Sequence, residues 1–302
     1  MLTPSALSNP VSQPRAGGAA GKESSGILWL ASYPKSGNTW IRAFLANYLS
    51  QSTEPVPLNM LPFYCLGDNF VVHYEQLTGR KADTLSETDI HQLRPVLHRW
   101  FVRSRRTTPL VKTHSLNGTL NERPLITADA TMGAIYVVRN PLDIVGSYAH
   151  HYQITADQAI DAMLHPGHIL PGSDKVLPQV IGSWQQHVLS WNHQSDFPVC
   201  LLRYEDLRAK PQLWFRRLVD FMGLPVEPTK LQRSIKASSF ASLARQEKTS
   251  GFVEARPGGK VNFFRRGQTG QWRDELTNAQ IARLTDGLGP IMQKFGYDGA
   301  IR

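Results

Sequence analysis

Residues 26–49 read GILWLASYPKSGNTWIRAFLANYL and form the most informative stretch of the chain. The first eight residues, GILWLASY, are an apolar run bounded by turn signals, which predicts a short buried strand. PKSGNT then forms a loop, and WIRAFLANYL carries apolar residues at helical spacing. In such a unit the loop amides and the helix N-terminus face one point, so we expect an anion site here. The loop departs from the usual GxxxxGK[ST] pattern of phosphate-binding loops.

A second strand–loop–helix unit spans residues 134–152, AIYVVRNPLDIVGSYAHHY. AIYVV predicts a strand, and the residues after it favour the start of a helix. Asn140 can serve as the N-cap, Pro141 is at the preferred first helical position, and Asp143 suits the first turn.

Two more strands are expected within residues 110–118, LVKTHSLNG, and 198–207, PVCLLRYEDL. A long amphipathic helix is predicted at 210–224, and a last helix at 276–297 that Gly287 or Gly289 interrupts. Strands that alternate with helices predict an α/β fold with a doubly wound parallel sheet in a single domain.

Ligands of such sheets bind beyond the C-terminal ends of the strands. Four polar residues directly follow predicted strands: Lys35, His114, Arg139 and Tyr204. We therefore expect these side chains to gather at one edge of the sheet.

The 302 residues, of which 41% are hydrophobic, suit one large globular domain or two small ones. Residues 1–25 are rich in Pro, Gly, Ser and Ala and predict a disordered leader, which leaves 26–302 as the folded domain. No apolar run approaches the roughly 18 residues of a membrane helix, and the leader lacks the apolar core of a signal peptide. Cys65 and Cys200 are predicted to be reduced thiols of a cytoplasmic chain.

The net charge of +9 fits nucleic acid, an acidic membrane surface or a multiply anionic small ligand. The basic residues are spread along the chain, and the densest short cluster is Arg103, Arg105 and Arg106. Aromatic residues are not interleaved with basic runs, as single-stranded nucleic acid binding would require. We therefore expect neither nucleic acid nor a membrane as a partner.

Four motifs resemble those of the cytosolic-type sulfotransferases, which transfer a sulfuryl group from PAPS (3′-phosphoadenosine 5′-phosphosulfate) to an acceptor. YPKSGNTW resembles the family's YPKSGTTW, VVRNPLDIVGSYAHH its RNPxDxxxSxYxx, KTH its KTH, and FRRGQTGQW its FRKGxxGDW. All four occur in the family's order and span residues 27–272. The resemblance implies a P-loop NTPase-like three-layer α/β/α fold. Asn38, Arg266 and Gln271 depart from the family's usual residues, and the KxxxTVxxxE dimer motif is missing, which leaves the oligomeric state open.

The resemblance implies three catalytic residues. His114 would be the general base, for which an ordinary imidazole pKa of about 6.5 is suitable near neutral pH. Lys35 would neutralise the bridging oxygen of the leaving group, and Lys112 would hold the transferring group. The reaction would be an in-line transfer that requires no metal.

The resemblance also implies the residues that bind PAPS and its product PAP (adenosine 3′,5′-bisphosphate). Lys35, Ser36, Gly37, Asn38 and Thr39 would cradle the 5′-phosphate. The 3′-phosphate would be held by five residues: Arg139, Ser147, Arg265, Arg266 and Gly267. Trp40 would stack on the adenine, and Tyr204 resembles the family's tyrosine near the adenine. Ser238 and Phe240 resemble part of the family's TSF stretch and would also bind the donor.

Other interpretations remain. A nucleoside or small-molecule kinase would have the same strand–loop–helix arrangement. It would also require a GK[ST] sequence and a strand-end aspartate for magnesium, and neither is at the expected place. A non-catalytic protein that binds PAP or RNA would not need His114 or Lys35. The histidine pairs at 150–151 and at 165 and 168 suggest a metal, but no carboxylate or cysteine partner is suitably spaced.

The acceptor is expected to be a small or medium-sized molecule that offers a hydroxyl or an amine. Its pocket is expected to involve residues 51–109, which carry few structural signals, and residues 153–180, which are predicted to form a loop excursion. Five aromatic residues in or near these segments suggest an apolar or aromatic pocket, and the same residues could equally belong to the core: Phe63, Tyr64, Phe101, Tyr148 and Tyr152.

Overall fold

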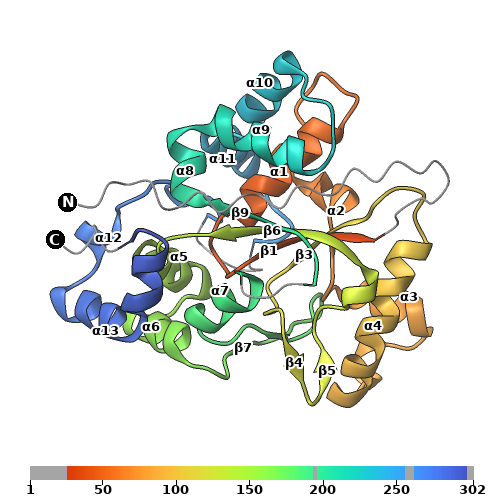
Figure 1. Ribbon diagram of the computed structural model, residues 1–302, viewed down its shortest axis with the longest axis horizontal. Coiled ribbons are helices and arrows are strands. Elements are labelled where there is room, and N and C mark those ends of the chain that lie inside the picture. The colour runs from red at the N-terminus through yellow and green to blue at the C-terminus, as the bar shows by residue number, and fades with distance from the viewer. Residues whose placement is uncertain (1–25, 193–195, 256–261, 298–302) are drawn as a thin grey trace.

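A computed structural model describes residues 26–192, 196–255 and 262–297. The predicted leader, residues 1–25, lies outside the described residues. A five-stranded sheet occupies the centre, with the order β2, β3, β1, β6, β9, and every neighbouring pair is parallel (Figure 1). Its strands are β2 (Leu66–Gly67), β3 (Leu110–Thr113), β1 (Ile27–Ser32), β6 (Thr131–Val138) and β9 (Val199–Arg203).

The alternation of side chains in β1 builds a core on each face of the sheet. Trp29 and Ala31 pack into one core, and Leu28 and Leu30 pack into the other. The first core includes residues of α4 (Glu87–Arg103), α5 (Pro141–Tyr152), α6 (Ala156–Leu164), α7 (Trp184–Asn192) and α13 (Asn278–Lys294). The second includes residues of α1 (Asn38–Leu49), α8 (Tyr204–Ala209), α9 (Pro211–Phe221) and α10 (Pro228–Ala237). The three-layer α/β/α prediction is therefore confirmed.

Helix starts follow the predicted local chemistry. The side chain of Asn140 accepts a hydrogen bond from the Leu142 amide, with Pro141 at the first position of α5. The capping residue therefore satisfies an otherwise unpaired amide at the helix N-terminus.

The prediction that glycine interrupts the last helix is wrong. Helix α13 runs from Asn278 to Lys294 without a break at Gly287 or Gly289. A side-chain carbon at Gly287 would lie 2.7 Å from a methyl carbon of Leu164, so the glycine lets α13 pack closely against α6. Packing between the two helices outweighs the low helix propensity of glycine.

The segment 153–180 is only partly a loop. It contains α6, which begins with a capping box formed by Thr155 and Gln158, and the short antiparallel pair β7 (Ile169–Leu170) and β8 (Gln179–Val180). Another capping box, at Ser86 and Asp89, starts α4 in the segment that carried few signals. Serine or threonine followed three residues later by an acidic or amide side chain is a readable signal, and it was missed in both places.

The structure also contains shorter helices, a separate two-stranded sheet and helix α11. They are η1 (Leu58–Met60), α2 (Leu61–Tyr64), α3 (Val71–Thr78), η2 (Ala82–Thr84), β4 (Thr119–Leu120), β5 (Arg123–Pro124), η3 (Ala128–Ala130), α11 (Phe240–Ser250) and α12 (Trp272–Glu275). Among the described helices, none is long and apolar enough to cross a membrane. Cys65 and Cys200 are free and buried.

Candidate active site

The loop between β1 and α1 adopts a conformation that only some residues tolerate. Lys35 has a φ of 67° and Gly37 a φ of 109°, both in the left-handed region. A side-chain carbon at Gly37 would lie 2.8 Å from the ring of Tyr204, so glycine is required there. Asn38 donates its side-chain amide to the Leu30 carbonyl at 3.0 Å. This bond ties the loop to β1 and directs the amide of Asn38 into the fold.

A cleft of about 890 Å³ opens at the C-terminal edge of the sheet. Almost all of the predicted site residues line it: Lys35, Gly37, Asn38, Thr39, Trp40, Lys112, His114, Arg139, Ser147, Tyr204, Phe240, Arg265, Arg266 and Gly267. Two predicted residues do not. Ser36 is buried in the loop, and Ser238 is buried at the end of α10, where its hydroxyl donates to the Ser234 carbonyl at 2.8 Å.

The imidazole of His114 has a defined orientation. Its Nδ1 donates to the Ser32 carbonyl at 2.8 Å, which leaves Nε2 as the nitrogen that can accept a proton. Burial, followed by the charge of Lys112, lowers the pKa of His114 to about 4. The ring is therefore neutral at pH 7, the state that a general base requires.

The ammonium of Lys35 lies 4.1 Å from the ring centroid of Phe263. Burial, followed by the charge of Arg139, lowers the pKa of Lys35 to about 7. A bound anion would favour the charged form, because an opposite charge nearby raises the pKa of an amine.

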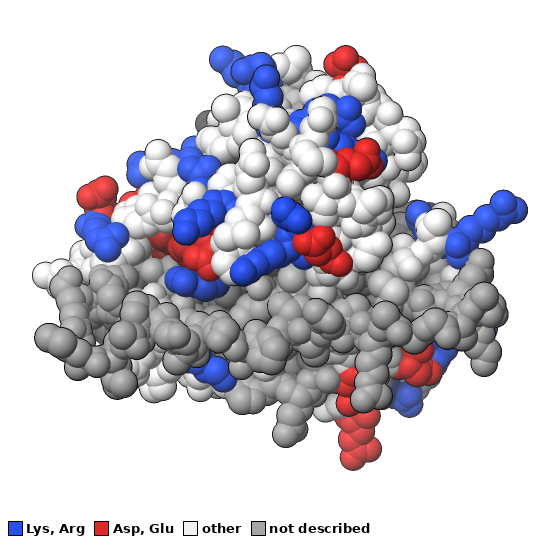
Figure 2. Space-filling model, turned by 45° about the horizontal axis from the view of Figure 1, so that its top comes forward, with Lys and Arg blue, Asp and Glu red and all other residues white. Residues whose placement is uncertain are grey.

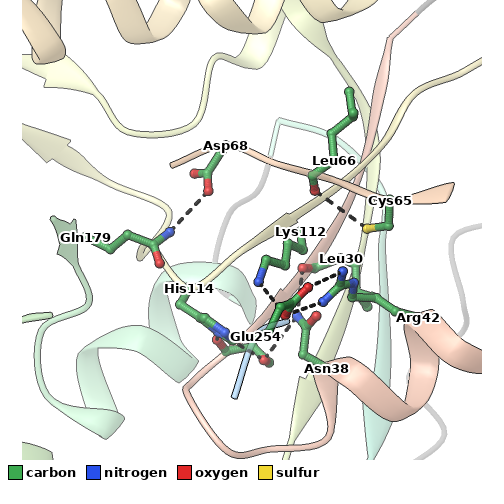
Figure 3. Close-up of polar contacts among 11 residues, drawn as sticks. Leu30, Asn38, Arg42, Cys65, Leu66, Asp68, Lys112, His114, Gln179 and Glu254 are labelled. Carbon is green, nitrogen blue, oxygen red and sulfur yellow. Dashed lines mark hydrogen bonds and ion pairs between the residues drawn. The ribbon is translucent and has the colours of Figure 1, made fainter. Parts of the chain in front are cut away.

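The ammonium of Lys112 is 3.1 Å from a carboxylate oxygen of Glu254, and Arg42 binds the same carboxylate (Figure 3). Neither Arg42 nor Glu254 was predicted from the sequence. The one available signal was an arginine within the apolar helix WIRAFLANYL, where a buried cation needs a partner.

Asp68 was also missed. Its carboxylate is fully buried and accepts a hydrogen bond from the Thr113 hydroxyl at 2.8 Å. It also accepts one from the Gln179 side-chain amide at 3.1 Å (Figure 3). Thr113 directly precedes His114, and Gln179 lines the cleft. Asp68 therefore links the end of β3 to the segment that contains β8.

The cations predicted to bind the 3′-phosphate have protein partners. Arg139 donates to the carbonyls of Lys35 at 3.1 Å and of Gln268 at 3.0 Å. Arg265 and Arg266 both pair with the carboxylate of Glu275, at 2.8 and 3.0 Å. These contacts gather three guanidinium groups at the side of the cleft that the C-terminal motif forms.

Asp143 holds this C-terminal motif against α5. Its two carboxylate oxygens accept the amides of Gly270 at 2.7 Å and Trp272 at 3.3 Å. The residue was predicted only as a favourable first-turn carboxylate, and the tertiary structure assigns it a second contact.

The rings predicted to bind adenine lie near one another. Trp40 is half-buried, and its ring centroid is 5.5 Å from those of Tyr204 and of Phe215, in edge-on contacts. Tyr204 lies beneath the guanidinium of Arg139, whose central carbon is 4.4 Å from the ring centroid. Trp40 thus belongs to the cleft wall and also packs against the core below it.

Of the five aromatic residues that suggested either an apolar pocket or the core, most do not line the cleft. Phe101 and Tyr148 are core residues, Phe63 is exposed, and Tyr64 lies outside the cleft lining, so only Tyr152 lines the cleft. The apolar lining instead includes Phe70, Val71, Val72, Leu170, Pro171, Val176, Leu177, Val253 and Phe263. Backbone hydrogen bonds between two distant segments bring several of these apolar residues to the cleft. The Val71 amide donates to the Lys175 carbonyl at 3.0 Å, and the Leu177 amide to the Asn69 carbonyl at 2.7 Å.

One face of the molecule carries charges of both signs. Figure 2 shows Lys and Arg side chains over the upper part of this face, with Asp and Glu side chains among them. Within the described parts of the chain, no group of three or more His, Cys, Asp or Glu side chains could hold a metal ion.

The family model described as Sulfotransferase domain matches residues 26–296. The chain belongs to this family. Sulfotransferase 1A1 of Rattus norvegicus is 27% identical over 268 residues, which cover 85% of this chain and 81% of that protein. Cytosolic sulfotransferase 16 of Arabidopsis thaliana is 27% identical over 286 residues, covering 90% of this chain and 77% of that protein.

Solved structures agree on the fold of this sulfotransferase. A crystal structure of mouse sulfotransferase SULT7A1 complexed with PAP superimposes with a TM-score of 0.59 at 18% sequence identity, covering 91% of this chain and 90% of that chain. Membership of the sulfotransferase family identifies the protein as an enzyme that transfers a sulfuryl group, and the solved structure has the same fold.

Proposed function

We propose that this sulfotransferase uses PAPS as the donor and a small-molecule hydroxyl or amine as the acceptor, in the cytoplasm. The main support is that residues of all four motifs line one cleft at the C-terminal edge of the sheet. Relatives that are named for small acceptors, such as the luciferin sulfotransferase of Photinus pyralis, support this substrate class. Other relatives are named cytosolic sulfotransferases, which supports the location.

The cleft has the properties that a bisphosphorylated donor requires. Eight cationic side chains line the cleft, against three carboxylates. The cations are Lys35, Arg42, Lys112, Arg139, Lys175, Arg208, Arg265 and Arg266, and the carboxylates are Glu75, Asp174 and Glu254. The Arg139 Nε is buried and has no hydrogen-bond partner within the described residues. Buried polar groups of this kind are normally satisfied, so this atom is consistent with an anionic ligand.

Each of three side chains has a separate role in the proposed reaction. PAPS supplies the sulfuryl group and leaves as PAP. His114 Nε2 takes the proton of the acceptor, while Lys112 faces the oxygens of the transferring group. Lys35 stabilises the negative charge that builds on the bridging oxygen, and the loop amides hold the 5′-phosphate. Catalysis of this kind depends mostly on position and electrostatics.

PAP is expected to raise the melting temperature of the purified protein, whereas ADP, AMP and ATP with Mg²⁺ are not. A ligand at 100 times its dissociation constant adds about 2.7 kcal/mol to the free energy of unfolding. The four ligands are compared by thermal denaturation in parallel. Stabilisation by ATP with Mg²⁺ and none by PAP would instead support the kinase interpretation. Stabilisation by PAP without turnover of PAPS would support a non-catalytic binding protein.

The kcat/KM for the donor is expected to fall as the pH rises above about 7, since the lowered pKa of Lys35 removes its charge there. On the acid side the profile is expected to stay flat until the pH nears about 4, where His114 becomes protonated. Steady-state kinetics between pH 4 and pH 10 would test this. In Lys35→Arg the basic limb should disappear, because arginine stays charged. A wild-type profile that is flat to pH 10 would contradict the role of Lys35.

A further inference from the structure

One carboxylate joins two cations beside the proposed reaction centre. Oε1 and Oε2 of Glu254 accept from the two terminal nitrogens of Arg42 at 2.7 and 2.8 Å, and Oε2 is also 3.1 Å from Nζ of Lys112. Figure 3 shows the three side chains converging next to His114, from α1, β3 and the segment after α11.

The geometry leaves Glu254 little freedom. The side chain of Arg42 is 1% exposed and that of Glu254 is 17% exposed. A guanidinium that binds both oxygens of a carboxylate fixes its plane as well as its position. Arg42 itself lies in a part of α1 where every residue from Ile41 to Tyr48 is buried. The Glu254 carboxylate is therefore held in place by Arg42 while it accepts a hydrogen bond from Lys112.

Lys112 can still bind an anion while it is paired with Glu254. One carboxylate between two cations gives the cluster a net charge of +1. An ammonium has three N–H donors, and only one is needed for Glu254, so two remain for other acceptors. The ring centroid of Phe70 lies 5.1 Å from Nζ and further limits where the ammonium can move.

We propose that Glu254, supported by Arg42, is a positioning residue that fixes the Lys112 ammonium against the transferring sulfuryl group. This inference rests on the proposed function, in which Lys112 faces the oxygens of that group. PAP lacks the sulfuryl group, so the position of Lys112 should matter for turnover and not for PAP binding.

The variant Glu254→Gln tests the proposal. Its kcat should fall about 30-fold, with the PAP dissociation constant and the donor KM within about threefold of wild type, because misplacement of a catalytic group costs rate. In a Lys112→Ala background the same change should lower kcat by less than about threefold, since no ammonium is left to position. Glu254→Asp keeps the charge with a shorter reach and should have an intermediate kcat. The matched control is Glu227→Gln, which alters an exposed ion pair with Lys230 and should leave the kinetics unchanged.

Three results would overturn the inference. The first is a kcat for Glu254→Gln within threefold of wild type. The second is an equal loss of PAP affinity and turnover, and the third is an additive loss in the double variant. If Glu254→Gln does not fold, a wild-type kcat in Glu254→Asp overturns it as well. Wild-type turnover of PAPS is measured first, and its absence overturns the proposed function and this inference together.

Discussion

His114→Ala is expected to lower kcat about 1,000-fold, within the range that a general base contributes, which is about 4 kcal/mol of the barrier. The affinity for PAP should stay close to the wild-type value. The imidazole makes one hydrogen bond to the chain backbone, from Nδ1 to the Ser32 carbonyl, and PAP carries no acceptor proton for Nε2 to remove.

The measurement combines steady-state turnover of PAPS with a titration of PAP against the same preparation. His91→Ala is the matched control, because His91 lies on α4 outside the cleft lining and should keep full activity. If PAP affinity is lost together with turnover in His114→Ala, the residue organises the donor site and the role of a base is wrong.

Lys35→Ala is expected to lower kcat by about 100- to 1,000-fold, which corresponds to about 2.7–4 kcal/mol of transition-state stabilisation. The bridging oxygen becomes negative as the sulfur–oxygen bond breaks, and the variant would leave that charge without its cation. The donor KM should rise less than kcat falls, because the interaction strengthens in the transition state.

The experiment measures kcat and donor KM for Lys35→Ala and for Lys248→Ala, which removes an exposed lysine of α11. Lys248→Ala should behave as wild type. A rise in donor KM with unchanged kcat would mean that Lys35 contributes only uniform binding of the donor, and the leaving-group role would have to be abandoned.

Several features of the site could be predicted from the sequence because they depend only on residues that are close together in the chain. The run GILWLASY, the loop PKSGNT and the helix after it lie within one stretch, so periodicity and turn residues predict the unit directly. The same holds for Asn140 and Pro141 at the start of α5. Residues that follow parallel strands meet at the C-terminal edge of the sheet. This rule correctly placed four residues together, because all four follow strands that run in one direction: Lys35, His114, Arg139 and Tyr204.

The acceptor side was predicted poorly for a different reason. Phe101 and Tyr148 are aromatic residues in the expected segments, yet the sheet buries both in its core. Composition cannot tell which face of a helix meets the core and which meets the cleft when long segments lack a clear period. Gly287 likewise looked like a helix break, because the contact with Leu164 that makes glycine useful there is absent from its local sequence.

The sequence by itself determined the strand–loop–helix units, the edge of the sheet where the predicted site residues gather, and the family, because each depends on short patterns along the chain. Only the tertiary structure decided which charges act together. Arg42 and Glu254 are 212 positions apart, and Lys112 and Glu254 are 142 apart. Their contacts exist because three separate segments pack around one cleft, and a buried cation obtains its partner from whatever the fold brings beside it.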